Sequence, residues 1–245
     1  MNLGSLVVTF YGHATFGLKI DDRKHWMLDP WLDENPACPD RLKSPPKIDT
    51  ILISHPHFDH IGDAVRLATR DDALCACIAE TAAWLRKKGV KKTLGFNKGG
   101  TADIDGIKVT MTHAVHSCGI TDGDEIIYGG EAAGYVITLP SGLRLYHAGD
   151  TCVFSDMKLI GDLYHPDIAF LPIGDFYTMD PLQGSHAIRM LGSKVVVPMH
   201  YGTFPALTGT PEKLRELTAD ISGLRIIDIK PGETLAGEVD RLVTA

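Results

Sequence analysis

Short apolar runs alternate along the chain with turn residues and with amphipathic stretches. Runs rich in Val, Ile and Thr between turn signals predict strands, because β-branched side chains favour extended backbone. The predicted strands cover residues 6–10, 16–20, 50–54, 107–112, 134–139 and 143–147. The turn Pro140-Ser141-Gly142 between the last two predicts a hairpin, so part of the strand pairing is antiparallel.

Helical patterns are interleaved with these strands. They begin near residues 62, 80, 183 and 210, and Gly89 and Gly192 predict the ends of the second and third. The last has the clearest start, with Thr210 as N-cap and Pro211 in the first helical position. Strand-rich halves at 6–112 and 134–229 then predict one domain, residues 1–245, with two sheets face to face and helices outside.

Composition and charge argue against several classes of binding partner and location. The chain has 245 residues, 44% of them hydrophobic, and a formal net charge of −7. This acidic balance argues against nucleic-acid binding, which needs basic clusters to neutralise phosphates. No apolar run is long enough to cross a membrane and no signal peptide is evident at the N-terminus, so we expect a cytoplasmic protein. The five scattered cysteines do not resemble a disulfide framework.

Directly after the predicted strand 50–54 comes a dense group of polar side chains, His55-Pro56-His57-Phe58-Asp59-His60. Pro56 disfavours helix at His55, so we expect a loop that lasts until the helix near residue 62. Imidazoles and a carboxylate at this density are the ligands that zinc and similar divalent metals select. The sequence therefore predicts a metal site at the end of this strand.

One hexapeptide cannot complete a catalytic metal site, and the remaining donors also follow predicted strands. Asp150 lies in "YHAGDT" and His200 in "VVVPMHYG", while His113 and His116 both follow the strand 107–112. Residues three apart in an extended chain face opposite sides, so only one of these two histidines can point into the site. The residues themselves leave that choice open.

The order of these motifs resembles that of the metallo-β-lactamase superfamily over nearly the whole chain. The strings "GHATFGLKI", "LISHPHFDH", "YHAGDT" and "VVPMHYGTFP" are most similar to small metal-dependent hydrolases related to L-ascorbate-6-phosphate lactonase. The resemblance implies an α+β fold, a four-layer αββα sandwich of two mixed sheets. It also favours His116 over His113.

The resemblance further implies two divalent ions and their ligands. One ion would be held by His55, His57 and His116, the other by Asp59, His60 and His200, and Asp150 would bridge them. Asp29, at the end of the strand "HWMLD", would orient a ligand histidine or the loop. Zinc comes first among the candidate metals, with manganese and iron(II) as the other options.

The ions would convert a bridging water into hydroxide, so no serine or cysteine nucleophile is needed. This agrees with the absence of a Gly-x-Ser-x-Gly motif. Asp59 and Asp150 are the predicted catalytic carboxylates, and His13 and Tyr201 are further catalytic candidates. Tyr177 and His186 are weaker candidates for substrate contact. The long loop 29–49 and the glycine-rich segment 121–134, most simply a hairpin, are candidate walls of the pocket.

The hypothesis that follows is a binuclear metal-dependent hydrolase acting on a small ester, lactone or phosphodiester. A non-catalytic metal sensor on the same scaffold is an alternative that sequence does not exclude. A di-iron redox protein is a further alternative, but it would need a carboxylate in place of His57 and an additional flavin domain. The expected partner is a small molecule, with neither nucleic acid nor membrane. The oligomeric state is open, a homo-oligomer included.

Overall fold

The computed structural model describes residues 1–239 and 242–244. The chain divides into two compact units, and each is built from segments that are separate in sequence. The first unit comprises Met1–Asn97, Ser117–Glu131 and Ile229–Ala245, and the second comprises Lys98–His116 and Ala132–Asp228. Each of the two large sheets lies wholly within one unit. That the chain is a single domain stays a prediction.

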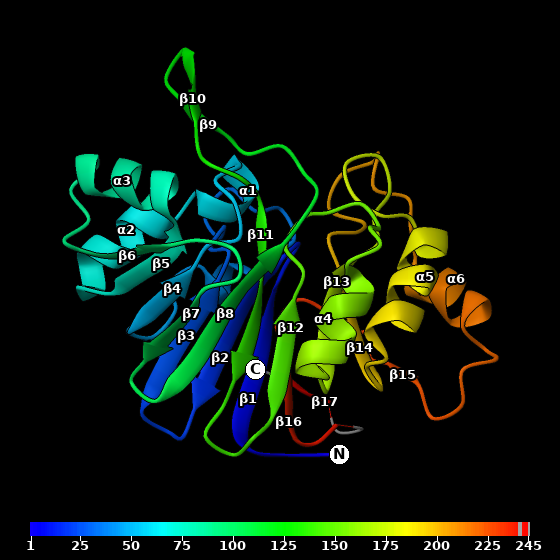
Figure 1. Ribbon diagram of the computed structural model, residues 1–245. Helices are drawn as coiled ribbons and strands as arrows, with labels where there is room; N and C mark the ends of the chain where they lie inside the picture. Colours follow the sequence, from blue (N-terminus) through cyan, green and yellow to red (C-terminus); the bar gives the residue numbers. More distant parts are fainter. Residues whose placement is uncertain (240–241, 245) are drawn as a thin grey trace. The chain divides into compact units, whose positions relative to one another are not determined.

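The first unit is built on an eight-stranded mixed sheet (Figure 1). Its strands, in spatial order, are β17 (Leu242–Thr244), β16 (Glu233–Glu238), β1 (Asn2–Gly12), β2 (Thr15–Ile20), β3 (Lys24–Leu28), β4 (Thr50–Leu52), β5 (Leu74–Ile78) and β6 (Lys92–Phe96). Strands β1 to β3 pair antiparallel, whereas β3 to β6 are parallel. The parallel part matters for function, because its strands all end at the same edge of the sheet.

Helices α2 (Ala64–Asp71) and α3 (Ala79–Lys87) pack on this parallel part. The inward positions of α2 are Ala64, Leu67 and Ala68, spaced by three and four residues as the core face of a helix requires. They join Ile51 of β4 and Cys75 of β5 in the apolar core of the first unit. Two shorter elements, the 3-10 helix η1 (Asp40–Leu42) and the single-turn helix α1 (Phe58–Ile61), complete the helical part.

A two-stranded hairpin, β9 (Gly119–Asp122) and β10 (Glu125–Tyr128), extends from the first unit (Figure 1). Asp122 pairs with Glu125, so the turn consists of Gly123 and Asp124, and Gly123 takes the left-handed φ of 63°. The prediction of a hairpin in this segment is confirmed.

The second unit is built on a seven-stranded mixed sheet. Its strands, in spatial order, are β15 (Arg225–Ile226), β14 (Val195–Met199), β13 (Ile168–Pro172), β12 (Arg144–His147), β11 (Ala133–Thr138), β8 (Ile107–His113) and β7 (Thr101–Ile104). Strands β12 to β15 are parallel, and β7, β8, β11 and β12 pair antiparallel. The predicted hairpin around Pro140 is confirmed as β11 and β12.

Three helices belong to this sheet: α4 (Met157–Tyr164), α5 (Pro181–Leu191) and α6 (Pro211–Leu217). Thr210 accepts a hydrogen bond from the backbone N–H of Lys213 at 3.2 Å, and Pro211 follows it, which confirms the predicted start of α6. Gly192 ends α5 in the left-handed conformation, as predicted. The helices pack on the sheet through an apolar core, in which Ile160, Ile188 and Leu214 of the helices join Tyr146 and Leu171 of the strands.

Two expectations were wrong, and one helix was missed. The boundary between the strand-rich halves does not fall after residue 112, because β8 pairs with β11, and β7 with β8, in the second unit, while β16 pairs with β1 in the first. The donor hexapeptide is not entirely loop, since α1 begins at Phe58; Pro56 restricts only the residue before it. Helix α4 has no counterpart among the predicted helices. None of the helices in the described part of the chain is both long and apolar enough to cross a membrane.

Candidate metal centre

In the first unit, the side chains with metal-binding chemistry follow the ends of β3 and β4. These strands are parallel neighbours, with Leu28 opposite Leu52, so the residues that follow them lie next to each other. The backbone N–H of Asp29 donates to the carbonyl of Leu52 at 2.9 Å and continues this alignment for one residue. The adjacency of two strand ends therefore brings Asp29 to the beginning of the donor segment 55–60.

Asp29 is the centre of a hydrogen-bond network. Its Oδ1 accepts from the backbone N–H of Ser54 at 2.6 Å, and its Oδ2 accepts from the Ser54 hydroxyl at 2.6 Å. The same Oδ2 lies 2.9 Å from Nδ1 of His60. Asp29 has a left-handed φ of 46°, which is uncommon outside glycine and is tolerated best by Asp and Asn.

This network fixes the tautomer of two histidines in their neutral form. A carboxylate only accepts, so Nδ1 of His60 carries the proton, and in the neutral ring Nε2 has the lone pair. The Ser54 hydroxyl donates its proton to Asp29, so its oxygen accepts a hydrogen bond from Nδ1 of His55 at 3.0 Å. In the neutral ring of His55, the lone pair is therefore also on Nε2. Both rings therefore present the form in which imidazole binds a metal.

His57 lies beside His55. Its Nδ1 is 3.0 Å from Nε2 of His55, and its Nε2 is 3.3 Å from the hydroxyl oxygen of Ser117. The ring of His60 lies on the other side of His55, with ring centroids 4.1 Å apart. Three imidazoles are thus gathered within the first unit, which is a costly arrangement unless a cation or a shared proton relieves it.

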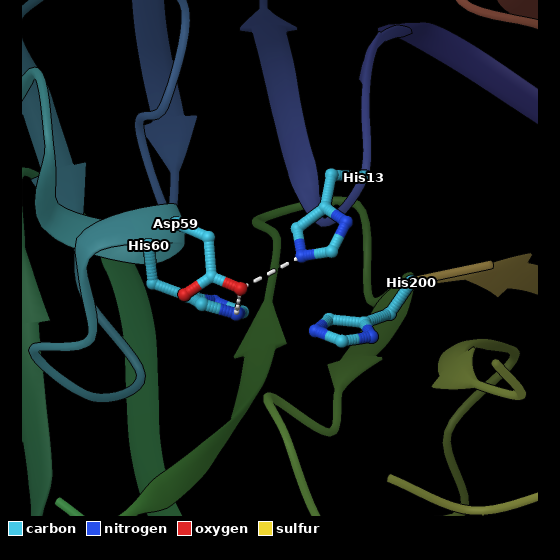
Figure 2. A group of neighbouring side chains, drawn as sticks. All are labelled: His13, Asp59, His60 and His200. Atoms are coloured by element: carbon cyan, nitrogen blue, oxygen red, sulfur yellow. Dashed lines mark hydrogen bonds and ion pairs between the residues drawn. The ribbon is translucent and has the colours of Figure 1, made fainter. Parts of the chain in front are cut away.

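Asp59 and His13 form the second part of the first unit's donor group. Nε2 of His13 lies 2.9 Å from Oδ2 of Asp59, and Nε2 of His60 lies 3.9 Å from the same oxygen (Figure 2). His13 comes from the turn between β1 and β2, whereas Asp59 and His60 belong to α1. The structure thus brings His13, predicted as a catalytic candidate, to Asp59.

The second unit has a donor group of its own, built from His116, Asp150 and His200. Oδ2 of Asp150 lies 3.0 Å from Nε2 of His200 and 3.7 Å from Nε2 of His116. Asp150 follows β12 and His200 follows β14, so both lie at the carboxyl ends of parallel strands. His200 has a left-handed φ of 57°.

Hydrogen bonds between two loops hold His116 near Asp150. The backbone N–H of Val115 donates to the hydroxyl of Thr151 at 3.0 Å, and the N–H of Cys152 donates to the carbonyl of Val115 at 3.2 Å. His113 lies elsewhere: its Nδ1 is 3.0 Å from the ammonium of Lys98. Of the two candidates that the sequence left open, His116 is the one that joins Asp150.

The contacts of the remaining candidates, Tyr201, Tyr177 and His186, do not indicate a role in metal binding. Tyr201 donates its hydroxyl to Oδ1 of Asp228 at 2.6 Å, and burial together with this carboxylate raises the pKa of Tyr201 well above its usual value. Tyr177 is exposed and packs edge-on against Phe176, with centroids 4.7 Å apart. His186 is exposed on α5. A role of these three residues in substrate contact or catalysis stays a prediction.

Two residues that sequence reasoning missed support the site. Ser54 connects Asp29 to His55, and its only sequence signal is its place between the apolar run and the first histidine. Asp63 accepts the backbone N–H groups of Leu32 and Asp33 and pairs with Arg66. It thereby fastens the start of the long loop 29–49 to the segment that follows the donors.

Three of the five cysteines do not compete with these donors. Burial raises the pKa of Cys75 to about 12 and that of Cys38 to about 11, and it raises the pKa of Cys77 well above its usual value. Their thiols are therefore protonated at neutral pH, and a thiol binds metals and attacks carbon only as the thiolate. The histidines with lone pairs at Nε2 and the aspartates are the donors that fit a divalent ion.

Comparison with known proteins agrees with this site chemistry. The model of the family described as the beta-lactamase superfamily domain matches residues 25–201, which include all the predicted ligands. The chain therefore belongs to the beta-lactamase superfamily.

Curated relatives cover nearly the whole chain. A UPF0173 metal-dependent hydrolase of Koribacter versatilis is 52% identical over 96% of this chain and 99% of its own length. Another, of Solibacter usitatus, is 56% identical over 85% of this chain and 90% of its own length. Within the superfamily, the chain thus belongs to the UPF0173 group.

A solved structure shows the same fold. Igni18, described as a novel metallo hydrolase from Ignicoccus hospitalis, is 36% identical and has a TM-score of 0.82, covering 94% of this chain and 97% of the other. With the two mixed sheets and their helices, this similarity confirms the predicted fold class, the α+β αββα sandwich of the metallo-β-lactamase type.

Proposed function

We propose that this protein is a binuclear metal-dependent hydrolase that cleaves a small ester, lactone or phosphodiester. The UPF0173 relatives named as metal-dependent hydrolases support the reaction type. The observation that carries the proposal is the network through which Asp29 and Ser54 leave Nε2 of His55 and His60 as lone-pair donors. A protein that used these rings only for packing would have no need to fix both tautomers the same way.

The proposed ligands are those that the family resemblance implies. His55, His57 and His116 would hold one ion, Asp59, His60 and His200 the other, and Asp150 would be shared. Zinc is the first candidate because the donors are imidazole and carboxylate, with manganese and iron(II) as alternatives. The chemistry that such ions supply is acidification of a water molecule to hydroxide near neutral pH and polarisation of the group under attack.

The chain's own residues would orient the ligand histidines and accept protons during the reaction. Asp29 holds His60 and, through Ser54, His55, so these rings keep their direction when a substrate enters. Asp59 and Asp150 are the proposed catalytic carboxylates that accept a proton during the reaction. Tyr201 is a weak choice of proton donor, because Asp228 occupies its hydroxyl and raises its pKa.

The sequence disfavours a di-iron redox protein, which would need a carboxylate at position 57, where this chain has His57. A metal sensor would bind ions without turnover, and one experiment separates it from the hydrolase. Purified protein is analysed for metals and is then assayed on a panel of lactones, esters and phosphodiesters, with protein stripped by a chelator as the control. Metal-dependent turnover of a member of the panel supports the hydrolase. Bound metal without turnover of any member favours the sensor.

We further propose a small molecule as the only partner of the site. The net charge of −7 disfavours nucleic acid. A cytoplasmic location stays a prediction, which fractionation of cell extracts would test. The oligomeric state stays open, and light scattering would determine it.

A further inference from the structure

His13 occupies an unusual backbone position. Strand β1 ends at Gly12 and β2 begins at Thr15, and these two residues pair, so His13 and Ala14 form a two-residue hairpin turn. His13 has a φ of 60°. A positive φ at the first residue of a tight hairpin turn is normally supplied by Asn, Asp or Gly, because most other side chains are strained there. The chain nevertheless has an imidazole at this point.

The strained turn places the ring among the donors of the first unit. The ring of His13 packs edge-on against Trp31, with centroids 5.2 Å apart, and against His60, with centroids 5.9 Å apart. These contacts hold the imidazole in one orientation. Backbone strain that the surroundings maintain in this way points to a function for the side chain that bears it.

Three ligand atoms converge at this point. They are Nε2 of His13, Oδ2 of Asp59 and Nε2 of His60, and all lie within 4.8 Å of one another (Figure 2). Nε2 of His60 has the lone pair because Nδ1 faces Asp29. Two atoms bound to one zinc ion at about 2.0–2.1 Å are about 3.3–3.4 Å apart in the tetrahedral geometry that zinc prefers. Oδ2 of Asp59 lies 2.9 Å from Nε2 of His13 and 3.9 Å from Nε2 of His60, one distance on either side of this value.

We infer that His13 is a metal ligand, binding through Nε2 the same ion as Asp59 and His60. The inference rests on the proposed function, to which it adds a ligand that the sequence resemblance did not supply. With His13, the first unit alone provides three protein ligands for this ion. Three is the number that catalytic zinc sites use when they keep a position open.

A simple hydrogen bond from His13 to Asp59 would give the same distance, so the variants must separate the two roles. His13→Gln keeps an amide N–H that can donate to Asp59, but an amide is a poor ligand for zinc. His13→Gly removes the ring and relieves the positive φ at the turn. The matched control is His25→Gln, because His25 also belongs to the first unit, and its Nδ1 lies 3.2 Å from the carbonyl of Lys47.

Each protein is stripped of metal, reloaded with zinc or cobalt(II) ions, and dialysed. Elemental analysis gives the ions per chain, competition with a chromogenic chelator gives their Kd values, and the visible spectrum of the cobalt protein reports the coordination. We expect two ions in the parent and in His25→Gln. In His13→Gln and His13→Gly, one ion should bind at least about tenfold more weakly, with a changed cobalt spectrum.

The melting temperature of the metal-free protein provides the second readout. Metal-free His13→Gln should still melt in one cooperative transition, so that its weaker ion site reflects a lost ligand and not a lost fold. Two tightly held ions and an unchanged cobalt spectrum in His13→Gln would overturn the inference and leave the proposed function standing. A parent protein that takes up no ion would overturn both.

Discussion

Asp29 and His60 are 31 residues apart in sequence, yet Oδ2 of Asp29 lies 2.9 Å from Nδ1 of His60. The contact exists because β3 and β4 are parallel neighbours whose carboxyl ends meet. It sets the protonated nitrogen of His60 and so decides which nitrogen is open to a metal. The same carboxylate acts on His55 through Ser54.

The first prediction concerns this contact. In Asp29→Asn the side chain loses its charge and one acceptor, so it holds Nδ1–H of His60 less firmly. We expect metal affinity to fall by about 10- to 100-fold, the usual cost of losing a carboxylate behind a ligand histidine. Chelator competition measures the change. Asp49→Asn is the matched control, because Asp49 also accepts a backbone N–H in the first unit, from His25 at 2.9 Å; an equal loss in both variants would contradict the prediction.

The second prediction concerns Ser54. Ser54→Ala removes the link from Asp29 to Nδ1 of His55, and the ring can then take either tautomer. We expect weaker metal binding, and we expect the double variant Asp29→Asn with Ser54→Ala to cost less than the sum of the two single changes, because both act through one network. A double-mutant cycle built from metal Kd values measures this coupling. Strict additivity would show that the two residues act independently.

The third prediction concerns the anchoring of the loop 29–49. Asp63→Ala leaves the backbone N–H groups of Leu32 and Asp33 without their carboxylate acceptor. Because Asp63 is buried, the variant should lose about 1–3 kcal/mol of unfolding free energy for each buried backbone N–H left without an acceptor. Urea unfolding of the metal-free protein measures the loss. Arg66→Ala should cost only about 0–1 kcal/mol, because the arginine is partly exposed; equal losses would contradict this account of Asp63.

The fourth prediction concerns alkaline pH. Burial raises the pKa of Cys75 from 9.0 to about 12, so the folded protein keeps a proton there that the unfolded chain releases. The contribution of this thiol to stability is complete below about pH 9 and is lost as the pH rises toward 12. In that window this group changes the unfolding constant by up to about tenfold per pH unit.

Urea midpoints at pH 8 and pH 10.5 measure this effect in the parent and in Cys75→Ala. Cys75→Ala should have a lower urea midpoint than the parent at pH 8, because the substitution leaves a cavity. Its midpoint should fall less than that of the parent between pH 8 and pH 10.5. An identical loss in both proteins would show that Cys75 does not contribute to the alkaline dependence. Cys152→Ala is the control, because Cys152 is only partly buried.

Much of the fold could be predicted because its signals are local. The cap Thr210, Pro211 and the stop Gly192 were recognised because each acts on the backbone of its own helix. The assignment of 107–112 to the first half failed for the opposite reason. Val109 pairs with Ile137 across the second sheet, and an alternating apolar strand does not specify its partner.

The sequence by itself determined the set of donors, because metal chemistry requires particular side chains and their density after strand 50–54 is visible in one line of text. Only the tertiary structure decided how these donors are prepared: which nitrogen of His55 and His60 is open, that His116 rather than His113 joins Asp150, and that His13 meets Asp59. Tautomer and orientation depend on hydrogen bonds between residues tens of positions apart. Those bonds exist only once the sheets have formed and brought their strand ends and turns together.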